Sequence, residues 1–456
     1  MLPYNRGRPG FKTAWQILPR QDAMNVAVIG GGYAGMAAAV TLAERRVPVT
    51  VFEAAKTLGG RARRIEHRDT VLDNGLHILI GAYGETLRLM RLVGADPEQG
   101  LLRLPLTWRV HQRFLLRAPR LPAPLHLVAG LIAATGAPLS ERFSAARFIW
   151  RMRRQGYALS QDVTVATLLD QHDQGWRMTR LLWHPLCVSA LNTPPASASA
   201  QVFLNVLRDT LDAGREASDL LLPRTDLSAL FPDPAAAYVT AQGGEVLTGQ
   251  RVTGIDQEAG GTEGAFTVRH AGGERTFSHV ICALPPYNAG AFLVGISALA
   301  DTAEAVERLA YQPIYSVYLC YPPQVRLPTP MLGFESTLLQ WAFDRGALAG
   351  QHGLIGAVIS AQGAHQDLPQ DELANLVHQE LQQQMGPSPD PLWHRVIAEK
   401  RATFSCTPGL RRPESRTPLR NFFLAGDYVA SDYPATLESA VRSGVNAARM
   451  IVNGTT

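Results

Sequence analysis

Three glycines near the start of the chain have the spacing needed to hold a dinucleotide. In the stretch VAVIGGGYAGMAAAVTLAE, residues 26–44, Gly30, Gly32 and Gly35 join a short apolar run to an alanine-rich run. In a strand–turn–helix unit, the first glycine makes the turn, the second admits a pyrophosphate to the backbone, and the third lets the helix pack on the strand. The helix start also presents free N–H groups and the positive end of its dipole to a phosphate.

A carboxylate stands where such a unit contacts the ribose. A second predicted strand, residues 48–52, ends at Glu53, roughly 20 residues beyond the glycine turn. A carboxylate there accepts hydrogen bonds from ribose hydroxyls and repels a 2′-phosphate, which disfavours NADP. The alternative is a tight turn in another kind of α/β protein, with Glu53 simply solvated. The complete strand–turn–helix–strand–acid pattern favours the nucleotide site.

Two further motifs, far apart in the chain, indicate which dinucleotide to expect. Gly59-Gly60 followed by Arg61 resembles the second fingerprint of the flavin-containing amine oxidase and phytoene desaturase superfamily. A predicted strand at 421–425 runs into Gly426-Asp427, which resembles the third fingerprint, and a helix is expected from about Thr436. The resemblance implies FAD. It places Arg61 near the pyrophosphate or a flavin carbonyl, Asp427 near a ribityl hydroxyl or the pyrophosphate, and the helix start at flavin O2.

A middle segment adds to the resemblance. Residues 237–255 resemble a superfamily segment in which a strand backbone contacts adenine, with Val252 at the matching position. The apolar run at 279–286 is predicted to be a buried strand that ends at two prolines and returns to the same domain. The expected FAD contacts are Gly30, Gly32, Tyr33, Ala34, Gly35, Glu53, Gly59, Gly60, Arg61, Gly75, His77, Val252, Gly426, Asp427, Thr436 and Leu437.

Length and composition indicate a globular protein with a large core. The chain has 456 residues, 46% of them hydrophobic and 18% charged, which suggests two closely connected domains. The net charge of +4 comes without a block of like charge, so nucleic acid is not an expected partner. The four cysteines show neither a CxxC pair nor metal-ligand spacing, so we expect no metal and a reducing compartment. The sequence contains no apolar run of about 18 residues.

The expected fold class is α/β, with a discontinuous Rossmann-type FAD-binding domain that carries an inserted α+β substrate domain. Residues 1–23 lack an apolar signal core, and Met24 directly precedes the first predicted strand. We expect these residues to form a disordered extension rather than a targeting peptide. The FAD-binding domain is predicted to comprise residues 24–90, 236–286 and 396–456, and the substrate domain residues 91–235 and 287–395.

Three other stretches resemble the hydroxysqualene dehydroxylases, also called squalene-associated FAD-dependent desaturases. They are residues 72–90, 181–209 and 217–239, and with the flavin motifs the resemblance covers nearly the whole chain after Met24. One departure is Leu76, where the family pattern has glutamine, so a polar role for that position is in doubt. Membership implies an enzyme in which reduced FAD gives a hydride to hydroxysqualene as its hydroxyl leaves, forming squalene for squalene or hopanoid biosynthesis.

Two alternatives to this function remain. A carotenoid or phytoene-type desaturase moves hydride the opposite way, from substrate to flavin, and the FAD motifs do not decide the direction. A non-catalytic prenyl-lipid-binding protein of the same fold could lose its flavin contacts, and the presence of Glu53, Arg61 and Asp427 argues against it. An amine oxidase is less favoured, because the segment after Asp427 offers only Tyr428 and Tyr433 as an aromatic pair for a substrate amine.

Loss of hydroxide to leave an allylic cation needs a dry apolar tunnel and one acid for the leaving oxygen. His77 is the first candidate for that acid, because it follows the strand expected beneath the flavin ring. The alternative is a structural histidine that bonds flavin or backbone. Tyr83 could line the substrate end of the flavin or simply pack, and Asp219 could instead cap a helix or pair with Arg224. The candidate substrate contacts are Tyr83, His184, Asn192 and Asp219.

Residues 121–160 combine apolar and aromatic residues with arginines, and two interpretations stay open. They form two amphipathic core helices, or a surface that dips into a bilayer with Arg147, Arg151, Arg153 and Arg154 near headgroups. We expect a bacterial cytoplasmic protein, peripheral on the inner face of the cytoplasmic membrane, with a long apolar isoprenoid substrate. The family resemblance implies partnership with the synthases that make hydroxysqualene. The sequence holds no second G-x-G-x-x-G for NAD(P)H, and the electron donor is left open.

Overall fold

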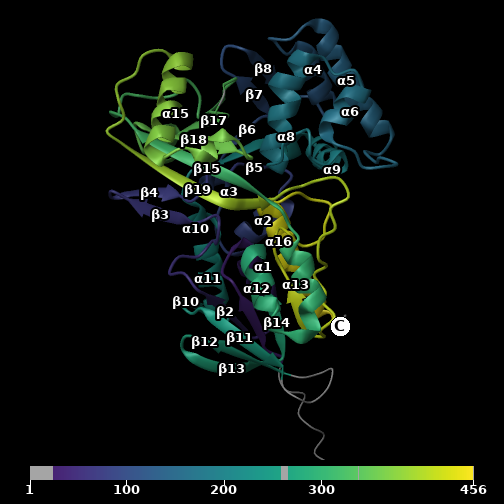
Figure 1. Ribbon diagram of the computed structural model, residues 1–456, viewed down its shortest axis with the longest axis vertical. Helices are drawn as coiled ribbons and strands as arrows, with labels where there is room; N and C mark the ends of the chain where they lie inside the picture. The colour runs from purple at the N-terminus through teal and green to yellow at the C-terminus, as the bar shows by residue number, and fades with distance from the viewer. Residues whose placement is uncertain (1–23, 258–264, 337, 455–456) are drawn as a thin grey trace, which may run out of the picture.

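A five-stranded parallel sheet forms the base of the molecule in the computed structural model, which describes residues 24–257, 265–336 and 338–454 (Figure 1). The expected N-terminal extension, residues 1–23, lies outside the described residues. The strand order is β10-β2-β1-β14-β20, so the sheet draws on both ends and the middle of the chain. Its strands are β1 (Val26–Ile29), β2 (Val49–Glu53), β10 (Glu245–Thr248), β14 (His279–Cys282) and β20 (Phe422–Leu424).

Alternate residues of these strands enter two different cores, because successive side chains point to opposite faces of a sheet. Val26, Val28 and Val51 pack with one face's helices, whereas Ile29 and Phe52 pack on the other side. The first face is covered by α1 (Tyr33–Glu44), α11 (Pro232–Ala241) and α16 (Leu437–Val452). The second is covered by an antiparallel sheet of β11 (Val252–Gln257), β12 (Phe266–His270) and β13 (Gly273–Phe277).

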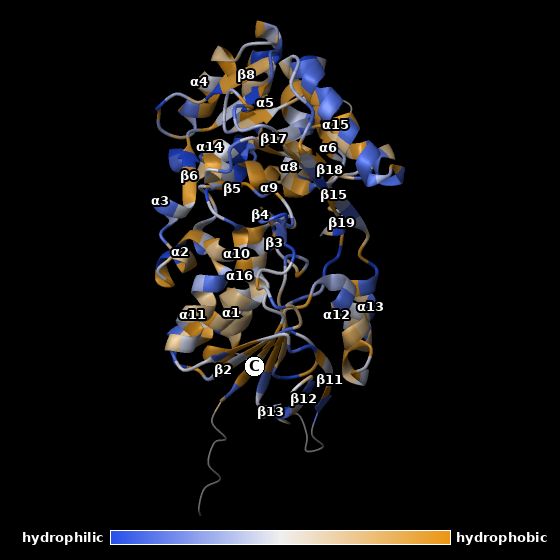
Figure 2. Ribbon diagram, turned by 90° about the vertical axis from the view of Figure 1, so that its left-hand side faces the viewer, coloured by the Kyte–Doolittle hydropathy of each residue, from blue (hydrophilic) through white to orange (hydrophobic). Residues whose placement is uncertain are grey.

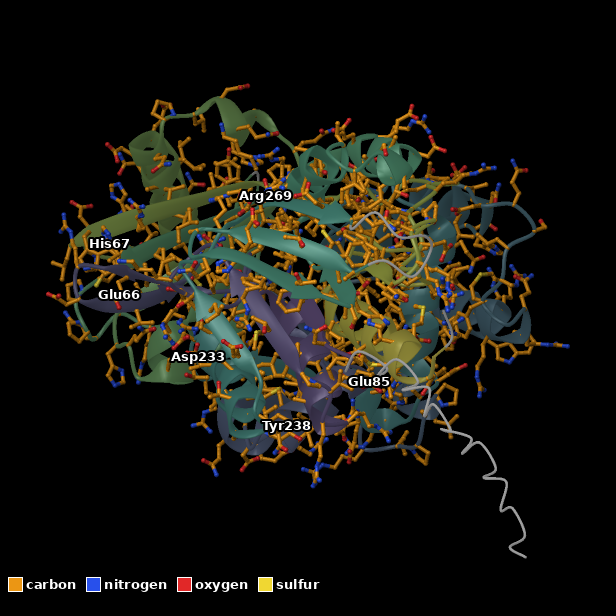
Figure 3. All side chains as sticks on the ribbon, turned by 90° about the horizontal axis from the view of Figure 1, so that it is seen from below. Glu66, His67, Glu85, Asp233, Tyr238 and Arg269 are labelled. Atoms are coloured by element: carbon orange, nitrogen blue, oxygen red, sulfur yellow. The ribbon has the colours of Figure 1, made fainter. Side chains whose placement is uncertain are left out.

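The view from below shows this layering. Asp233 and Tyr238 of α11 lie on one side of the parallel strands, and Arg269 of β12 lies on the other (Figure 3). Phe52 of β2 contacts the outer sheet edge-on through Phe277, with ring centroids 5.8 Å apart. The strand–turn–helix order, the parallel pairing and the two covered faces confirm the predicted Rossmann-type α/β fold.

A seven-stranded sheet forms the middle of the upper part in Figure 1. Its order is β19-β15-β18-β17-β16-β7-β8, and every pairing is antiparallel except that of β16 with β7. Helix α15 (Gln370–Met385) packs on β15 and β19. The strands are β7 (Thr107–Val110), β8 (Phe114–Arg117), β15 (Tyr311–Cys320), β16 (Met331–Gly333), β17 (Trp341–Asp344), β18 (Leu354–Ser360) and β19 (Trp393–Phe404).

A block of short helices lies beside the seven-stranded sheet, at the upper right of Figure 1. A five-residue π-helical turn, Thr179–Trp183, links two of them. Buried leucines and aromatic residues from the block join the core of the outer cofactor sheet into one continuous cluster. The helices are α4 (Leu125–Ala133), α5 (Leu139–Arg154), α6 (Val165–Gln171), α7 (Trp176–Met178), α8 (His184–Leu191) and α9 (Ala200–Leu211).

Short elements connect the part built on the five-stranded sheet with the part built on the seven-stranded sheet. Strand β9 (Leu220–Pro223) pairs with both β5 (Leu79–Ile80) and β6 (Leu101–Leu104), and a hairpin is formed by β3 (Arg64–His67) and β4 (Thr70–Asp73). The remaining helices are α2 (Gly84–Leu92), α3 (Pro97–Gly100), α10 (Leu227–Leu230), α12 (Pro286–Leu293), α13 (Ala300–Glu307) and α14 (Arg345–Ala349).

The predicted domain boundaries differ from the elements in three places. The expected boundary at 396 falls inside β19, which belongs to the seven-stranded sheet, and that at 236 falls inside α11, which packs on α1. Helices α12 and α13 were expected in the substrate domain but lie beside the five-stranded sheet (Figures 1 and 2). The reason is that apolar patterning predicts a strand or helix without saying which sheet it packs on.

Candidate functional site

The residues predicted to bind a dinucleotide meet at one edge of the parallel sheet. Gly30 follows β1, Glu53 ends β2, Ala283 follows β14 and Asp427 lies just beyond β20. Parallel strands bring their carboxyl ends to the same edge, which is where open α/β sheets bind ligands. Residues nearly 400 positions apart in the sequence are therefore neighbours here.

Glycines shape the turn at this edge. Gly30 has a φ of +110°, and a Cβ there would stand 2.7 Å from the carbonyl oxygen of Ala283. A Cβ on Gly35 would stand 1.9 Å from the carbonyl oxygen of Gly30, so only glycine allows α1 to start this close to β1. Gly32 forms a β-bridge with Gly59, and a Cβ on Gly32 would be 3.8 Å from the Cα of Gly60. The backbone of the turn after β1 and the backbone of the Gly59-Gly60 segment therefore lie side by side.

The start of α1 can receive an anion. Its N-cap is Gly32, which offers no side chain, and no acidic residue stands in the first turn. The N–H groups of Tyr33 and Ala34 thus lie at a helix end with a positive dipole and no capping carboxylate. Tyr33 itself points elsewhere, because its hydroxyl donates to the carbonyl oxygen of Leu227 at 2.8 Å. Its contribution to the site is its backbone.

Glu53 is held in place by the backbone of both neighbouring segments. One carboxylate oxygen accepts from the N–H of Gly31 and the other from the N–H of Ala55, each at 2.7 Å. The side chain stays partly exposed, so both oxygens keep lone pairs for ribose hydroxyls. The N–H of Gln250 donates to the carbonyl oxygen of Glu53 at 2.8 Å, which brings the start of β11 and Val252 to the same place.

Arg61 and Asp427 form an ion pair across the site. Nη2 of Arg61 lies 2.6 Å from Oδ1 of Asp427, and Nη1 donates to the carbonyl oxygen of Ala402 at 2.6 Å. The Asp427 side chain is almost fully buried and that of Arg61 is about a quarter exposed. The second and third fingerprints therefore hold one another, with a guanidinium edge left accessible for a phosphate or carbonyl.

The start of α16 stands over this pair. Thr436 caps the helix by accepting from the N–H of Ser439 at 3.1 Å, and Leu437 is the first helical residue. Tyr83 lies next to Thr436, and burial raises the pKa of the Tyr83 hydroxyl. Tyr83 thus lies at the cofactor helix, where it is a neighbour of the FAD segment. Its predicted contact with substrate stays a prediction.

Three residues near the site were not predicted from the sequence. Ser443 accepts from the N–H of Gly426 at 2.8 Å, and buried Glu438 accepts from the N–H groups of Glu85 and Thr86 at 3.0 Å. Arg412 packs on Phe404 and donates to the carbonyl oxygen of Asp427 at 3.4 Å. Only Glu438 had a local signal, as an acid in the first turn of a predicted helix.

Tyr428 carries a polar atom that the described residues leave without a partner. Its hydroxyl is buried with no hydrogen bond in that part of the chain, although Arg61 and Asp427 are close enough to act on its charge. Burial raises the pKa of this hydroxyl well above its ordinary value, so it is a neutral donor. A buried donor without an acceptor is costly unless a ligand supplies one.

Replacing Tyr428 with phenylalanine is expected to stabilise the cofactor-free protein by about 1 kcal/mol while weakening FAD binding about fivefold to tenfold. The two effects oppose each other because the Tyr428 hydroxyl has no hydrogen-bond partner to lose among the described residues. Thermal unfolding of apoprotein and titration with FAD measure them. Tyr33→Phe is the matched control and should only destabilise, since it breaks the bond to Leu227. An unchanged FAD affinity in Tyr428→Phe would contradict a hydrogen bond from the Tyr428 hydroxyl to FAD.

His77 lies in the loop between β4 and β5, two residues beyond Gly75. Its Nδ1 is 2.8 Å from the carbonyl oxygen of Gly75. Burial lowers the pKa of the imidazole below its ordinary value, so the ring is neutral at pH 7. A carbonyl oxygen accepts only, so Nδ1 carries the proton and Nε2 is left as an acceptor in this arrangement. His77 must therefore take up a proton before it can act as an acid.

His184 and Asn192, two further candidate substrate contacts, lie in different surroundings. His184 begins α8 and its pKa is lowered by burial. Asn192 is engaged by the protein itself: its side-chain amide donates to Thr403 at 2.9 Å and accepts from the N–H of Ala361 at 2.8 Å. With φ at +46°, Asn192 ends α8 and joins it to β15, to β19 and to the residue that follows β18. Both polar atoms of its side chain are thus engaged by the protein, and its predicted substrate contact stays a prediction.

Asp219 pairs with other arginines than Arg224, which was one of the two alternatives to its predicted substrate contact. Its carboxylate is buried and lies 3.2 Å from Arg103, with Arg215 at 4.0 Å, while Arg224 is exposed. Strand β9 follows Asp219 and pairs with β6, which carries Arg103. The antiparallel register, and not the nearness of Arg224 in the chain, selects the partner.

These observations test whether FAD fits. The edge offers an uncapped helix start, two facing glycine segments, a carboxylate with free lone pairs, an accessible guanidinium and an unpartnered hydroxyl. These are the groups that a pyrophosphate, a ribose and a ribityl chain require, so the residues fit. Among the described residues, no group of three or more His, Cys, Asp or Glu could hold a metal ion.

The chain was compared with known proteins. The model of the family described as flavin containing amine oxidoreductase matches residues 33–452. The hydroxysqualene dehydroxylase of Rhodopseudomonas palustris is 29% identical over 445 residues, covering 94% of this chain and 98% of that protein. That of Sinorhizobium fredii is 28% identical, covering 94% and 99%. The crystal structure of an oxidoreductase from Methanosarcina mazei matches with a TM-score of 0.73 at 16% identity, covering 93% and 100%, which supports the fold.

Proposed function

The chain belongs to the flavin-containing amine oxidoreductase family and is an FAD-dependent oxidoreductase, and from that premise we propose that it converts hydroxysqualene to squalene. The similarity to two hydroxysqualene dehydroxylases supports the proposal, because it covers both the cofactor part and the substrate part of the chain. The proposed substrate is a long apolar isoprenoid.

The contact between α9 of the substrate part and the loop after Asp427 of the cofactor part supports the same function. Helix α9 comes from the stretch that resembles the dehydroxylases most specifically, and it holds the loop after Asp427. Asn205 donates to the carbonyl oxygen of Asp432 at 3.1 Å, and the hydroxyl of Tyr433 donates to Asp209. Arg442 of α16 packs over the ring of Tyr433. The particular α9 sequence therefore fixes the segment that leads into the cofactor helix, and this is the observation that carries the proposal.

The proposed reaction breaks the allylic C–O bond and forms one C–H bond. The hydroxyl leaves with a proton as water, and reduced FAD, when bound, supplies the hydride that completes squalene. The protein must exclude water from the cation that forms as the bond breaks. Leu76 and Ile78 flank His77 and pack against the large core cluster, so this loop is apolar on both sides of the histidine. Leu76, at the position where glutamine was expected, adds to that apolar surface.

A single anaerobic turnover tests the proposal. The purified protein is photoreduced, hydroxysqualene is added in detergent, and flavin absorbance and extracted lipid are followed together. We expect flavin reoxidation with one squalene formed per flavin. Reduced flavin that stays reduced would overturn the proposal. Oxidation of a polyene such as phytoene by the oxidised enzyme would then favour the desaturase, and protein without flavin would favour the lipid carrier.

Replacing His77 with alanine is expected to slow turnover about 100-fold with FAD still bound. The proposed role is proton transfer to the leaving hydroxyl, and the lowered pKa makes that role depend on proton uptake. Wild-type turnover should therefore fall as pH rises through the lowered pKa of His77, so the fall should begin below pH 6.5, and this pH dependence should be absent in His77→Ala. The control is His352→Ala, which changes an exposed histidine. Normal turnover in His77→Ala would remove His77 from the acid role.

A further inference from the structure

Helix α5 presents an apolar stripe to solvent. Leu139, Phe143 and Trp150 are each about half exposed, at 51%, 50% and 53%. Spacings of three and four residues place all three on one side of a helix, together with Arg147 and Arg154. Side chains this large and apolar, exposed together in a row, are unusual on a soluble surface.

The opposite side of the same helix is firmly packed. Ala145, Phe148, Ile149 and Met152 are buried in the large core cluster. Arg142 donates to the carbonyl oxygens of Ile132 and Ala134, at 2.7 and 2.5 Å, and so ties the end of α4 to the start of α5. The stripe is thus the outer face of a well-anchored helix, so its exposure is a property of the folded protein.

A further large apolar side chain is exposed on the neighbouring helix α7. Trp176 is 63% exposed, and Glu141 in the first turn of α5 holds its helix by accepting from the N–H groups of Arg177 and Met178 at 3.0 Å. Ten large hydrophobic side chains are exposed among the described residues, and six of them fall between 121 and 176. These helices form the end of the molecule farthest from the parallel sheet (Figures 1 and 2). We call the residues Leu139, Phe143 and Trp150 the α5 face.

Positive charge borders this face. Arg147, Arg151 and Arg154 are exposed, and none of them forms an ion pair within the described part of the chain. Arg154 stacks on the ring of Trp150 at 4.8 Å, and Arg177 stacks on Trp176 at 5.6 Å. Stacking keeps each guanidinium beside an aromatic ring that can enter an apolar phase, while the charge stays at its edge.

We propose that the α5 face binds the surface of an anionic phospholipid bilayer. Aromatic and aliphatic side chains would enter the headgroup boundary, and the bordering arginines would contact phosphate groups, as in interfacial amphipathic helices. A second copy of this chain fits less well, because a two-fold contact would place the unpaired arginines of one copy against those of the other. No helix in residues 24–257, 265–336 or 338–454 is long and apolar enough to cross a membrane. The proposal does not depend on the substrate.

Vesicle flotation with the full-length holoenzyme tests the proposal. Vesicles of phosphatidylcholine alone are compared with vesicles that contain phosphatidylglycerol at about a third of the lipid. We expect binding to the anionic vesicles, at least about tenfold weaker binding to the neutral ones, and release by high salt. Equal binding to both compositions, or no binding to either, would overturn the proposal.

Two double variants separate the apolar and the charged contributions. Phe143→Ser with Trp150→Ser is expected to weaken binding about tenfold or more, and Arg147→Gln with Arg154→Gln about 25-fold. The matched controls change equally exposed residues elsewhere: Val294→Ser with Leu392→Ser, and Arg224→Gln with Arg326→Gln. Circular dichroism and flavin content check that each variant is folded.

Two results would refute the assignment of the face. One is wild-type binding by both α5 variants. The other is a change in oligomeric state, measured by light scattering, when Phe143 and Trp150 are replaced while vesicle binding stays unchanged. The second result would assign the face to contact between copies of the chain. Loss of binding in both α5 variants and in neither control would establish the bilayer contact.

Discussion

Replacing Gly444 with alanine is expected to destabilise the protein by about 3 kcal/mol and to abolish FAD retention. A Cβ on Gly444 would stand 2.0 Å from the carbonyl oxygen of Ala34 and 3.1 Å from the N–H nitrogen of Ala38. Both atoms belong to the backbone of α1, so no side chain can turn away to make room. Helix α16 must therefore shift away from α1.

A shift of α16 away from α1 would disturb two elements of the cofactor site. Ala34 lies in the first turn of α1, whose N–H groups are expected to bind the pyrophosphate, and α16 starts at the cap Thr436. The variant's unfolding free energy and bound flavin are measured together. Gly84→Ala is the control, because a Cβ there meets no atom within 4 Å and its φ is not positive. Full flavin content in Gly444→Ala would show that the spacing of α1 and α16 does not govern binding.

Replacing Glu53 with alanine is expected to weaken FAD affinity about 100-fold. Two ribose hydroxyls lose a charged acceptor, at about 1.5 kcal/mol or more each, which together amount to about two powers of ten. The N–H groups of Gly31 and Ala55 also lose the acceptor that holds them at 2.7 Å. The turn between β1 and α1 is then less well ordered before FAD arrives.

Titration of apoprotein with FAD, followed by flavin fluorescence, measures this affinity. Glu66→Ala removes a carboxylate of the same type from an exposed position on β3, at the edge of the molecule in Figure 3, and should bind FAD like the wild type. An affinity of Glu53→Ala within a factor of two of the wild type would mean that the adenosine does not lie at the end of β2.

The strand–turn–helix unit could be predicted closely from the sequence. The apolar run and the alanine-rich run around the three glycines are observed as strand Val26–Ile29 and helix Tyr33–Glu44, and the second strand, predicted at 48–52, is observed as Val49–Glu53. Its signals are local: an apolar run, three glycines of which two leave no room for a Cβ, and a carboxylate one strand later. The similarity to a flavin-containing family and the fold confirm the FAD prediction. Individual site contacts, including those of Gly75 and Val252, stay predictions.

The partners of long-range polar groups could not be predicted in this way. Asn192 reads as a candidate for substrate because it stands in a family-specific stretch, yet its amide joins α8 to strands more than 100 residues away. Asp219 pairs with Arg103 through the register of β6 and β9 rather than with Arg224, five positions along the chain. A carboxylate has several basic residues near it along the chain, and only the pairing of the strands decides which of them it contacts.

The amino-acid sequence by itself determined the nucleotide-binding unit, the type of cofactor and the elements that carry them. Each of these depends on short local motifs, even where two motifs lie far apart in the chain, because glycine conformation and apolar periodicity act within each motif. The tertiary structure alone decided that Arg61 pairs with Asp427, 366 positions away, that the Tyr428 hydroxyl has no hydrogen-bond partner among the described residues, and that the stripe on α5 faces solvent. Distance, burial and exposure arise only when separate segments pack together, so no local pattern encodes them.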